Sequence, residues 1–195
     1  MATKTINGAV VDSAVLYRKA GVSKRHRDFR IQDSKSEQWN NHYNKLKEAY
    51  SRGGISILIG DRGCGKTQAS ACLIGHSTYG EFKSAIYTKA FDIFLNIRDG
   101  FNNNSKATEV QQVKKYTDAH LLVIDAYEVR GDTEFENRTL DHIIDKRYDM
   151  QRPTVIITND TAQKFGEVLG KSIKDRIKDG GGVLVYDGES MRGNG

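Results

Sequence analysis

The sequence predicts a single α/β domain with a five-stranded parallel sheet flanked by helices. Three observations lead to this fold class. Short apolar runs alternate with helical patterns along most of the 195 residues, which is typical of a parallel sheet. A glycine-rich loop joins one run, residues 55–59, to a helical pattern at residues 68–74. Another run, residues 121–125, ends in the carboxylate of Asp125.

Composition excludes membrane and disulfide-rich proteins. The longest apolar runs reach about six residues, whereas a spanning helix needs roughly 18–20. The N-terminus lacks the apolar segment of a secretory signal. The two cysteines, Cys64 and Cys72, are too few for a disulfide framework and are expected to be free thiols. We therefore expect a cytoplasmic protein without a membrane partner.

The net charge of +5 is concentrated near the N-terminus. Residues 1–52 hold 11 Lys and Arg against 5 Asp and Glu, whereas the remaining residues hold 19 against 20. We divide the chain into a basic N-terminal arm, residues 1–34, and a core, residues 35–195. The basic cluster at residues 24–30 suits a nucleic acid or an acidic partner. A solvated surface explains the charge equally well, so composition leaves both readings open.

The segment before the glycine-rich loop contains one clear helical pattern. Residues 8–17 fit a short strand or an irregular arm. Apolar residues at three- and four-residue steps predict a helix over residues 36–50 that packs against the sheet, with a buried face of Trp39, Tyr43, Leu46 and Tyr50. Two glycines at positions 53 and 54 separate this helix from the next strand.

The loop after the strand 55–59 fits the pattern G-x-x-x-x-G-K-[ST]. Its glycines allow the backbone to turn N–H groups inward around a phosphate, and the positive end of the next helix faces the same anion. Lys66 can reach the β- and γ-phosphates, and the Thr67 hydroxyl is a Mg²⁺ ligand. We therefore predict an ATP–Mg²⁺ site whose contacts are Gly60, Asp61, Arg62, Gly63, Cys64, Gly65, Lys66, Thr67 and Gln68.

Strands and helices alternate through the rest of the chain. The predicted strands are residues 84–88, 121–125, 154–158 and 183–186, and the predicted helices are residues 89–97, 107–116, 133–148, 163–169 and 173–178. We expect the helix 89–97 to bury Phe91, Phe94 and Leu95. The helix 133–148 is expected to turn inward Phe135, Leu140, Ile143 and Ile144.

Two strand ends carry further candidates for the site. Asp125 is predicted to support the Mg²⁺ together with Thr67. Ala126 follows it, where many ATPases with this layout have a glutamate that activates the attacking water. Glu128 reaches the site only if the loop bends, and is otherwise a solvated charge. Asn159, after the fourth strand, is placed to orient water or contact the γ-phosphate; an Asx turn is the alternative.

Two arginines near the C-terminus are weaker candidates. Arg176 lies in a basic helical segment, from which it could reach the γ-phosphate on a neighbouring subunit. Arg192 could reach the same phosphate within its own subunit. From sequence alone, surface charge is the better explanation of each arginine.

Taken in order, these motifs resemble the bacterial helicase loaders of the DnaC/DnaI type, ATPases of the AAA+ class. The matching stretches are residues 20–29, 60–67, 121–125, 152–159, 169–176 and 190–192, so that the resemblance covers roughly residues 18–192. The glycine-rich loop alone is generic, whereas the ordered set is more specific. Most AAA+ proteins carry a C-terminal helical lid; these loaders and the related IstB-like transposition helpers do not.

The resemblance implies an ATP-dependent protein that binds single-stranded DNA and helps to place a hexameric, DnaB-type replicative helicase. It implies head-to-tail self-assembly and assigns Asn159 as sensor 1, Arg176 as the arginine finger and Arg192 as sensor 2. It also implies DNA contacts near Arg98, Phe101 and Phe135, because exposed aromatic rings stack on bases. Phe135 fits a buried core position equally well.

Three departures from the family pattern bear on function. Ala126 replaces the usual glutamate, Ser172 stands where an additional arginine is common, and a short basic arm stands where these loaders have a helicase-binding domain. Such a compact form is what a phage or mobile element encodes, which would place the protein in the bacterial host cytoplasm. Two alternatives follow: an IstB-like transposition helper, and a non-hydrolysing ATP-binding adapter or inhibitor of the helicase.

Overall fold

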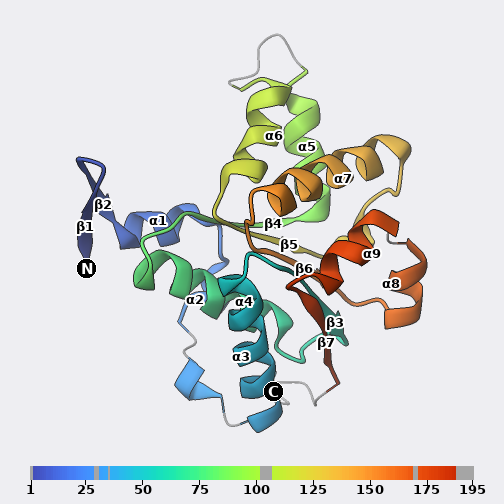
Figure 1. Cartoon of the computed structure of the whole chain (residues 1–195), viewed down its shortest axis with the longest axis horizontal. Helices are drawn as coiled ribbons and strands as arrows, with labels where there is room; N and C mark the ends of the chain where they lie inside the picture. The colour runs from blue at the N-terminus through green and yellow to red at the C-terminus, as the bar shows by residue number, and fades with distance from the viewer. Residues whose placement is uncertain (1, 29–30, 35, 102–106, 169–170, 188–195) are drawn as a thin grey trace.

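A computed structural model describes residues 2–28, 31–34, 36–101, 107–168 and 171–187. Within these residues, five parallel strands form one sheet in the order β4-β5-β6-β3-β7 (Figure 1). The strands are β3 (Ile55–Gly60), β4 (Ala85–Lys89), β5 (Leu121–Asp125), β6 (Thr154–Thr158) and β7 (Gly182–Tyr186). The predicted α/β class with a five-stranded parallel sheet is confirmed, and each predicted strand lies within one residue of its observed bounds.

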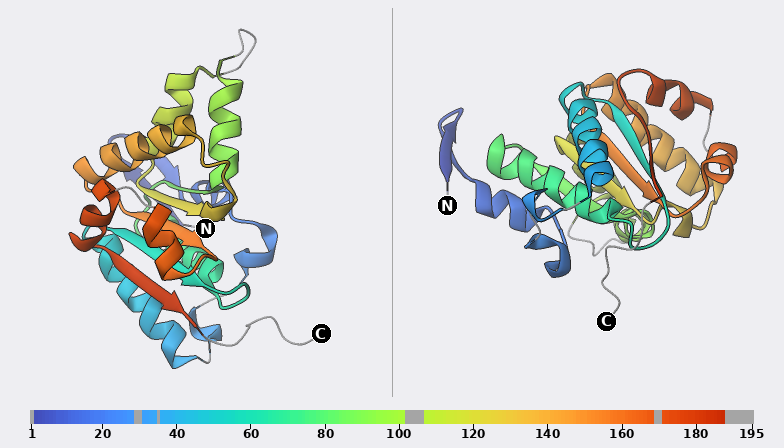
Figure 2. Two further views of the ribbon diagram at one scale, coloured as in Figure 1. Left: turned by 90° about the vertical axis from the view of Figure 1, so that its right-hand side faces the viewer. Right: turned by 90° about the horizontal axis from the view of Figure 1, so that it is seen from below.

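Helices cover both faces of the sheet. The described helical segments are α1 (Ser13–Lys19), α2 (Lys24–Arg27), η1 (Ile31–Asp33), α3 (Glu37–Ser51), α4 (Lys66–Gly75), η2 (His76–Gly80), α5 (Ala90–Asp99), α6 (Glu109–Asp118), η3 (Tyr127–Val129), α7 (Glu134–Asp149), α8 (Ala162–Val168) and α9 (Lys171–Lys178). α3 and α4 pack on one face; α5, α7 and α9 pack on the other (Figures 1 and 2). No helix of the described residues is long and apolar enough to cross a membrane.

The middle strands are apolar on both sides because both faces of the sheet are covered. In β3, Leu58 points into the cluster beneath α3 and α4, whereas Ile57 and Ile59 point into the cluster beneath α5, α7 and α9. β6 alternates in the same way, and all five of its residues are buried. A strand buried on both faces reads as a continuous β-branched run rather than an alternating one.

Residues ahead of the core pack onto it. A short hairpin, β1 (Thr3–Ile6) with β2 (Ala9–Asp12), stands away from the sheet beside α1 (Figure 2). Behind it, Tyr17, Ala20 and Val22 are buried in the same hydrophobic cluster as Trp39 and Tyr43 of α3. The division of the chain at residue 34 stays a prediction, but the buried side chains of residues 17–22 are part of the main core.

One local expectation was wrong, and another was right only in part. Phe91 and Leu95 are 45% and 48% exposed, because α5 begins at Ala90 and turns Ala90, Ile93, Phe94 and Ile97 inward. Within residues 8–17, the expected short strand is present as β2, but it ends at Asp12, and the residues after it begin α1, which was not expected. The Asp12 side chain accepts a hydrogen bond from the N–H of Ala14 and so starts that helix. The buried face predicted for α3 is confirmed.

Arg147 of α7 connects the end of α6 to the start of β6 through hydrogen bonds inside the core. Its side chain is fully buried and donates to the carbonyls of Tyr116, Thr117, Ala119, His120 and Pro153 and to the hydroxyl of Thr154. These acceptors lie at the end of α6 and at the start of β6. Burial, and then the charge of Arg152, lowers the pKa of the Arg147 guanidinium to about 9, so it remains charged at neutral pH.

The strand register gathers the candidate residues at one edge. Ile59 lies opposite Thr158 in the β3–β6 pair, and Ile124 lies opposite Ile156 in the β5–β6 pair. The carboxyl ends of β3, β5 and β6 therefore meet, and each ends directly before or at a candidate residue. This edge is where open α/β sheets bind ligands.

Candidate functional site

The glycine-rich loop connects β3 to α4 and leaves the start of that helix open. Gly63 and Gly65 have φ of 96° and 94°, a left-handed conformation that suits glycine. Gly65 caps α4 without a side-chain hydrogen bond, so the first N–H groups of the helix are not taken by a capping side chain. Free N–H groups and the positive end of the helix dipole make this position suitable for a phosphate.

Lys66 lies folded over the loop that precedes it. Its Nζ donates to the carbonyls of Gly60 at 2.5 Å and Asp61 at 2.8 Å, and to Oδ1 of Asn159 at 3.1 Å. The Cys64 thiol donates to the same Asp61 carbonyl at 2.8 Å. The ammonium group is buried among acceptors at the mouth of the loop, which holds its charge where a phosphate would contact it.

Asp125 receives hydrogen bonds on both carboxylate oxygens. Oγ1 of Thr67 donates to Oδ2 at 3.2 Å, and the Tyr87 hydroxyl donates to the same oxygen. The N–H of Ala126 donates to Oδ1 at 2.7 Å. Because Thr67 gives its proton to the carboxylate, its oxygen lone pairs remain for a cation. Hydroxyl and carboxylate oxygens are the ligands that Mg²⁺ takes, so these residues fit the ion.

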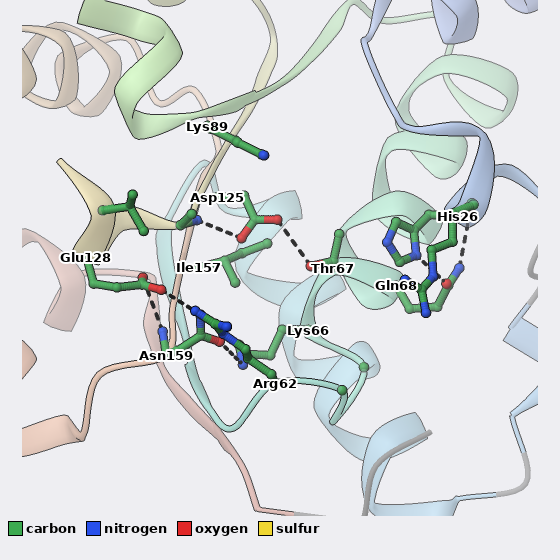
Figure 3. Close-up of a pocket in the computed structure, with 15 residues that line it drawn as sticks. His26, Arg62, Lys66, Thr67, Gln68, Lys89, Asp125, Glu128, Ile157 and Asn159 are labelled. Atoms are coloured by element: carbon green, nitrogen blue, oxygen red, sulfur yellow. Dashed lines mark hydrogen bonds between the residues drawn. The ribbon is translucent and has the colours of Figure 1, made fainter. Parts of the chain in front are cut away.

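The loop after β5 bends back to the cleft. Ala126 has φ of 52° and ψ of 47°, and η3 follows it directly. This turn brings the Glu128 carboxylate to β6, where it accepts from Oγ1 of Thr158 at 3.1 Å, from the N–H of Asn159 at 3.3 Å and from its Nδ2 at 2.5 Å. The structure thus brings Glu128, Asn159 and Lys66 into one hydrogen-bonded row (Figure 3).

These groups line a cleft of about 540 Å³. In Figure 3, Glu128 and Asn159 lie on one side, Lys66 and Thr67 in the middle, and His26 with Gln68 on the other side. Among the described residues, the lining carries four cationic side chains, Arg25, Arg62, Lys66 and Lys89, against the carboxylates of Asp125 and Glu128. This excess of positive charge fits a polyphosphate.

Among the described residues, four polar or charged side chains that line or support this cleft were not predicted to do so. Arg25 and His26 come from α2, where the His26 ring shares a 2.9 Å hydrogen bond with Oε1 of Gln68. Lys89 and Tyr87 come from β4. The basic run at residues 24–30 was the only signal for the first two, and it did not indicate which ligand they face. Burial, and then the charge of Asp125, raises the pKa of Tyr87, so its hydroxyl stays protonated.

Several predicted residues lie elsewhere. Gly60, Asp61 and Cys64 belong to the loop but turn toward Lys66 rather than lining the cleft. Arg176 lies on α9, where it donates to Asp145 of α7 and its guanidinium stands 5.3 Å from the centre of the Tyr148 ring. Arg192 lies outside the described residues.

The predicted DNA-contacting residues form a cluster beyond the cleft, at the far end of α5. Phe101 is 56% exposed, and its ring centre lies 6.2 Å from that of Phe135. The Arg98 guanidinium lies 5.7 Å from the Phe135 ring centre and 3.8 Å from a carboxylate oxygen of Glu136. Phe135 is half-buried, so its ring forms the base of the cluster while Phe101 stands in solvent.

The parallel sheet, the glycine-rich loop, and the acidic and polar strand ends beside it define a P-loop nucleotide-binding domain. The chain belongs to the IstB-like ATP binding protein family, which matches residues 29–194. Membership in this family confirms the resemblance inferred from the motifs. It also indicates that the ligand of the cleft is a nucleotide.

Known relatives agree with this family. The chain is 28% identical over 137 residues to the replicative helicase loader DnaC of Escherichia coli (strain K12), covering 70% of this chain and 55% of that protein. It thus spans about half the length of the curated relatives it matches. The crystal structure of the DnaC helicase loader has a similar fold, with a TM-score of 0.68 and 16% identity over 85% of this chain and all of that one. AMPPCP-bound DnaA from Aquifex aeolicus has a TM-score of 0.69 and 18% identity, covering 85% of this chain and 51% of that one.

Proposed function

We propose that this protein is an ATP–Mg²⁺-dependent helicase loader of DNA replication. In this role it binds single-stranded DNA and uses its nucleotide state as a switch for assembly with a hexameric replicative helicase. One observation carries the nucleotide part: Lys66, Thr67, Asp125, Glu128 and Asn159 meet through hydrogen bonds at one sheet edge. The similarity to the loader DnaC supports the helicase as partner.

The residues of the cleft have distinct roles in this proposal. The N–H groups at the start of α4 and the ammonium of Lys66 bind the β- and γ-phosphates, and Lys66 exchanges its loop carbonyls for phosphate oxygens. Thr67 and Asp125 would hold Mg²⁺ through their side-chain oxygen atoms. When bound, Mg²⁺ neutralises charge that develops on the phosphate oxygens. Arg25 and Lys89 add positive charge from the arm and from β4.

Glu128 takes the place of the missing glutamate after Asp125. Its carboxylate lies in the cleft lining and is held by Thr158 and Asn159, close to the Lys66 ammonium that marks the phosphate end. A carboxylate in this position can take a proton from water, while the Asn159 amide orients the carboxylate. We therefore assign Glu128 as the general base and Asn159 as its positioning partner in ATP hydrolysis.

The aromatic cluster provides the DNA contact. Phe101 offers an exposed ring for stacking on a base, with Phe135 beneath it and the Arg98 cation beside it. Stacking with a nearby cation binds single strands without sequence preference. This matches a protein that acts on any exposed strand.

Head-to-tail assembly completes the site in this proposal. Arg176 is the candidate arginine finger toward a neighbouring subunit. In the single chain its guanidinium is bound to Asp145, and it would have to leave this carboxylate to reach a phosphate. Arg192 is the candidate for the γ-phosphate within the same subunit. Such a contact between unlike surfaces produces an open spiral rather than a closed dimer.

A second function, that of a transposition helper, follows from the resemblance to IstB-like proteins, and the chain belongs to the IstB-like ATP binding protein family. The two functions share the nucleotide site and differ in partner. Size-exclusion of the purified chain with ATP and Mg²⁺, mixed with a cognate hexameric helicase or with a cognate transposase, tests the choice. ATP-dependent co-elution with the helicase supports the loader; co-elution with the transposase alone supports the helper and refutes the loader.

A further inference from the structure

Tyr87 reaches the nucleotide cleft from the edge strand β4, and no motif in the sequence marks it. Its hydroxyl donates to Oδ2 of Asp125, the oxygen that also accepts from Thr67 at 3.2 Å. The N–H of Ala126 holds the other oxygen at 2.7 Å. Of the three donors, Thr67 is itself a candidate Mg²⁺ ligand and Ala126 is backbone. Tyr87 is therefore a side-chain donor to the carboxylate that is not itself a candidate Mg²⁺ ligand.

The sheet register explains how a tyrosine reaches this position. β4 and β5 are parallel neighbours, with Tyr87 opposite Val123 and Lys89 opposite Asp125. Tyr87 thus starts two residues before the carboxylate, an offset of roughly 6–7 Å along the strands. Its long side chain leans along the strand and covers that offset. Phenylalanine has the same ring at this position but lacks the hydrogen-bond donor.

The backbone of Tyr87 is fixed from its other side by the N-terminal arm. Its N–H donates to the carbonyl of Ala20 at 2.7 Å, which gives the edge strand a partner. A Cβ atom at Gly21 would lie 2.9 Å from the Tyr87 carbonyl, so the arm approaches as closely as a glycine permits. The arm and the metal-binding carboxylate therefore contact the same residue.

We propose that Tyr87 is a positioning residue that holds Asp125 in the orientation that binds Mg²⁺, and so sets the Mg²⁺ affinity of the nucleotide complex. The inference rests on the proposed ATP–Mg²⁺ binding. Without the hydroxyl, Oδ2 keeps one donor, Thr67, and Oδ1 keeps the N–H of Ala126, so the carboxylate is held less firmly in its orientation. Loss of an outer partner of a metal ligand typically weakens metal affinity 10–100-fold.

The test measures binding rather than turnover. The affinity of the full chain for a fluorescent ATP analogue is followed while free Mg²⁺ is raised from an EDTA baseline to millimolar. In Tyr87→Phe, we expect the free Mg²⁺ concentration that gives half of the maximal gain in nucleotide affinity to rise about tenfold. The nucleotide affinity in EDTA and the melting temperature should stay close to those of the wild type. Tyr116→Phe is the matched control, because Tyr116 is a buried hydroxyl that binds Asn96 away from the cleft.

The outcomes separate the inference from the function it rests on. A normal Mg²⁺ response in wild type with an unshifted or lower midpoint in Tyr87→Phe overturns the role of Tyr87 and leaves the nucleotide site standing. A wild type whose nucleotide affinity ignores Mg²⁺ overturns both. Equal shifts in Tyr87→Phe and Tyr116→Phe would mean a general loss of packing and would also overturn it.

Discussion

Replacing Glu128 by glutamine tests the catalytic part of the site most sharply. The change keeps the size and one oxygen of the side chain but removes the base. The native carboxylate accepts three hydrogen bonds, from the Thr158 hydroxyl and from two N–H donors of Asn159. A carboxamide cannot accept all three, because its NH₂ group must face at least one donor.

The structure sets the size of the two expected effects. Removing a general base typically lowers turnover 10²- to 10⁴-fold, which is about 3–5 kcal/mol in activation free energy. ATP affinity should change by less than about threefold, because Glu128 reaches Lys66 only through Asn159. The expected result is thus a large loss of kcat with a nearly unchanged KM.

The assay is steady-state ATP turnover, with and without single-stranded DNA, alongside nucleotide binding. Glu134→Gln is the matched control, because Glu134 is an exposed carboxylate on α7 outside the cleft. Asn159→Ala should lose turnover too, and the double variant should lose little more, since the two residues act together. Wild-type turnover in Glu128→Gln would refute the assignment. No turnover in the wild type would favour the non-hydrolysing adapter.

Three further predictions concern stability, pH and DNA. Arg147→Met should lower the free energy of unfolding, measured in urea, by about 3–5 kcal/mol, because the buried carbonyls that Arg147 binds lose their hydrogen-bond donor. A loss below about 1 kcal/mol would contradict this. Burial, and then Lys83, lowers the pKa of His120 to about 4, so the unfolded chain binds a proton between pH 6.5 and 4 that the folded chain does not. The full shift corresponds to about 3 kcal/mol, but solvent screens the half-exposed ring, so stability should fall by about 1–2 kcal/mol as the pH is lowered through that window. The fall should be smaller in His120→Gln; equal slopes in the two proteins would count against it. Phe101→Ala should weaken binding to an oligothymidine strand by about 1–3 kcal/mol, as measured by fluorescence anisotropy, whereas Phe91→Ala, an exposed ring outside the cluster, should not. Equal losses of DNA affinity in the two variants would refute the role of the aromatic cluster in DNA binding.

Most of the fold could be predicted from the sequence, because the patterns that indicate its strands and helices are local and recur along the chain. The strands around Leu58, Val123 and Ile156 are continuous apolar runs, and such runs have few other stable arrangements. The phosphate loop was equally clear, since its glycines, Lys66 and Thr67 have a fixed spacing. The error at Phe91 and Leu95 came from the start of α5, where one residue of shift rotates the buried face by about 100°.

The rest of the site depended on long-range geometry that spacing does not encode. Glu128 reaches the cleft only because Ala126 adopts a left-handed conformation, which is uncommon for alanine. Arg25 and His26 line it only because the arm folds back onto α4. Tyr87 contacts Asp125 only through the register of two strands that lie more than 30 residues apart in sequence.

The central claim is that this cleft binds ATP with Mg²⁺, and one titration tests it directly. Isothermal titration of ATP–Mg²⁺ into the wild type, Lys66→Ala and the exposed-surface control Lys45→Ala gives three affinities. Lys66 places its ammonium at the mouth of the loop, so its removal should abolish measurable binding while Lys45→Ala binds as the wild type does. ATP affinity that is unchanged in a folded Lys66→Ala variant would contradict the site.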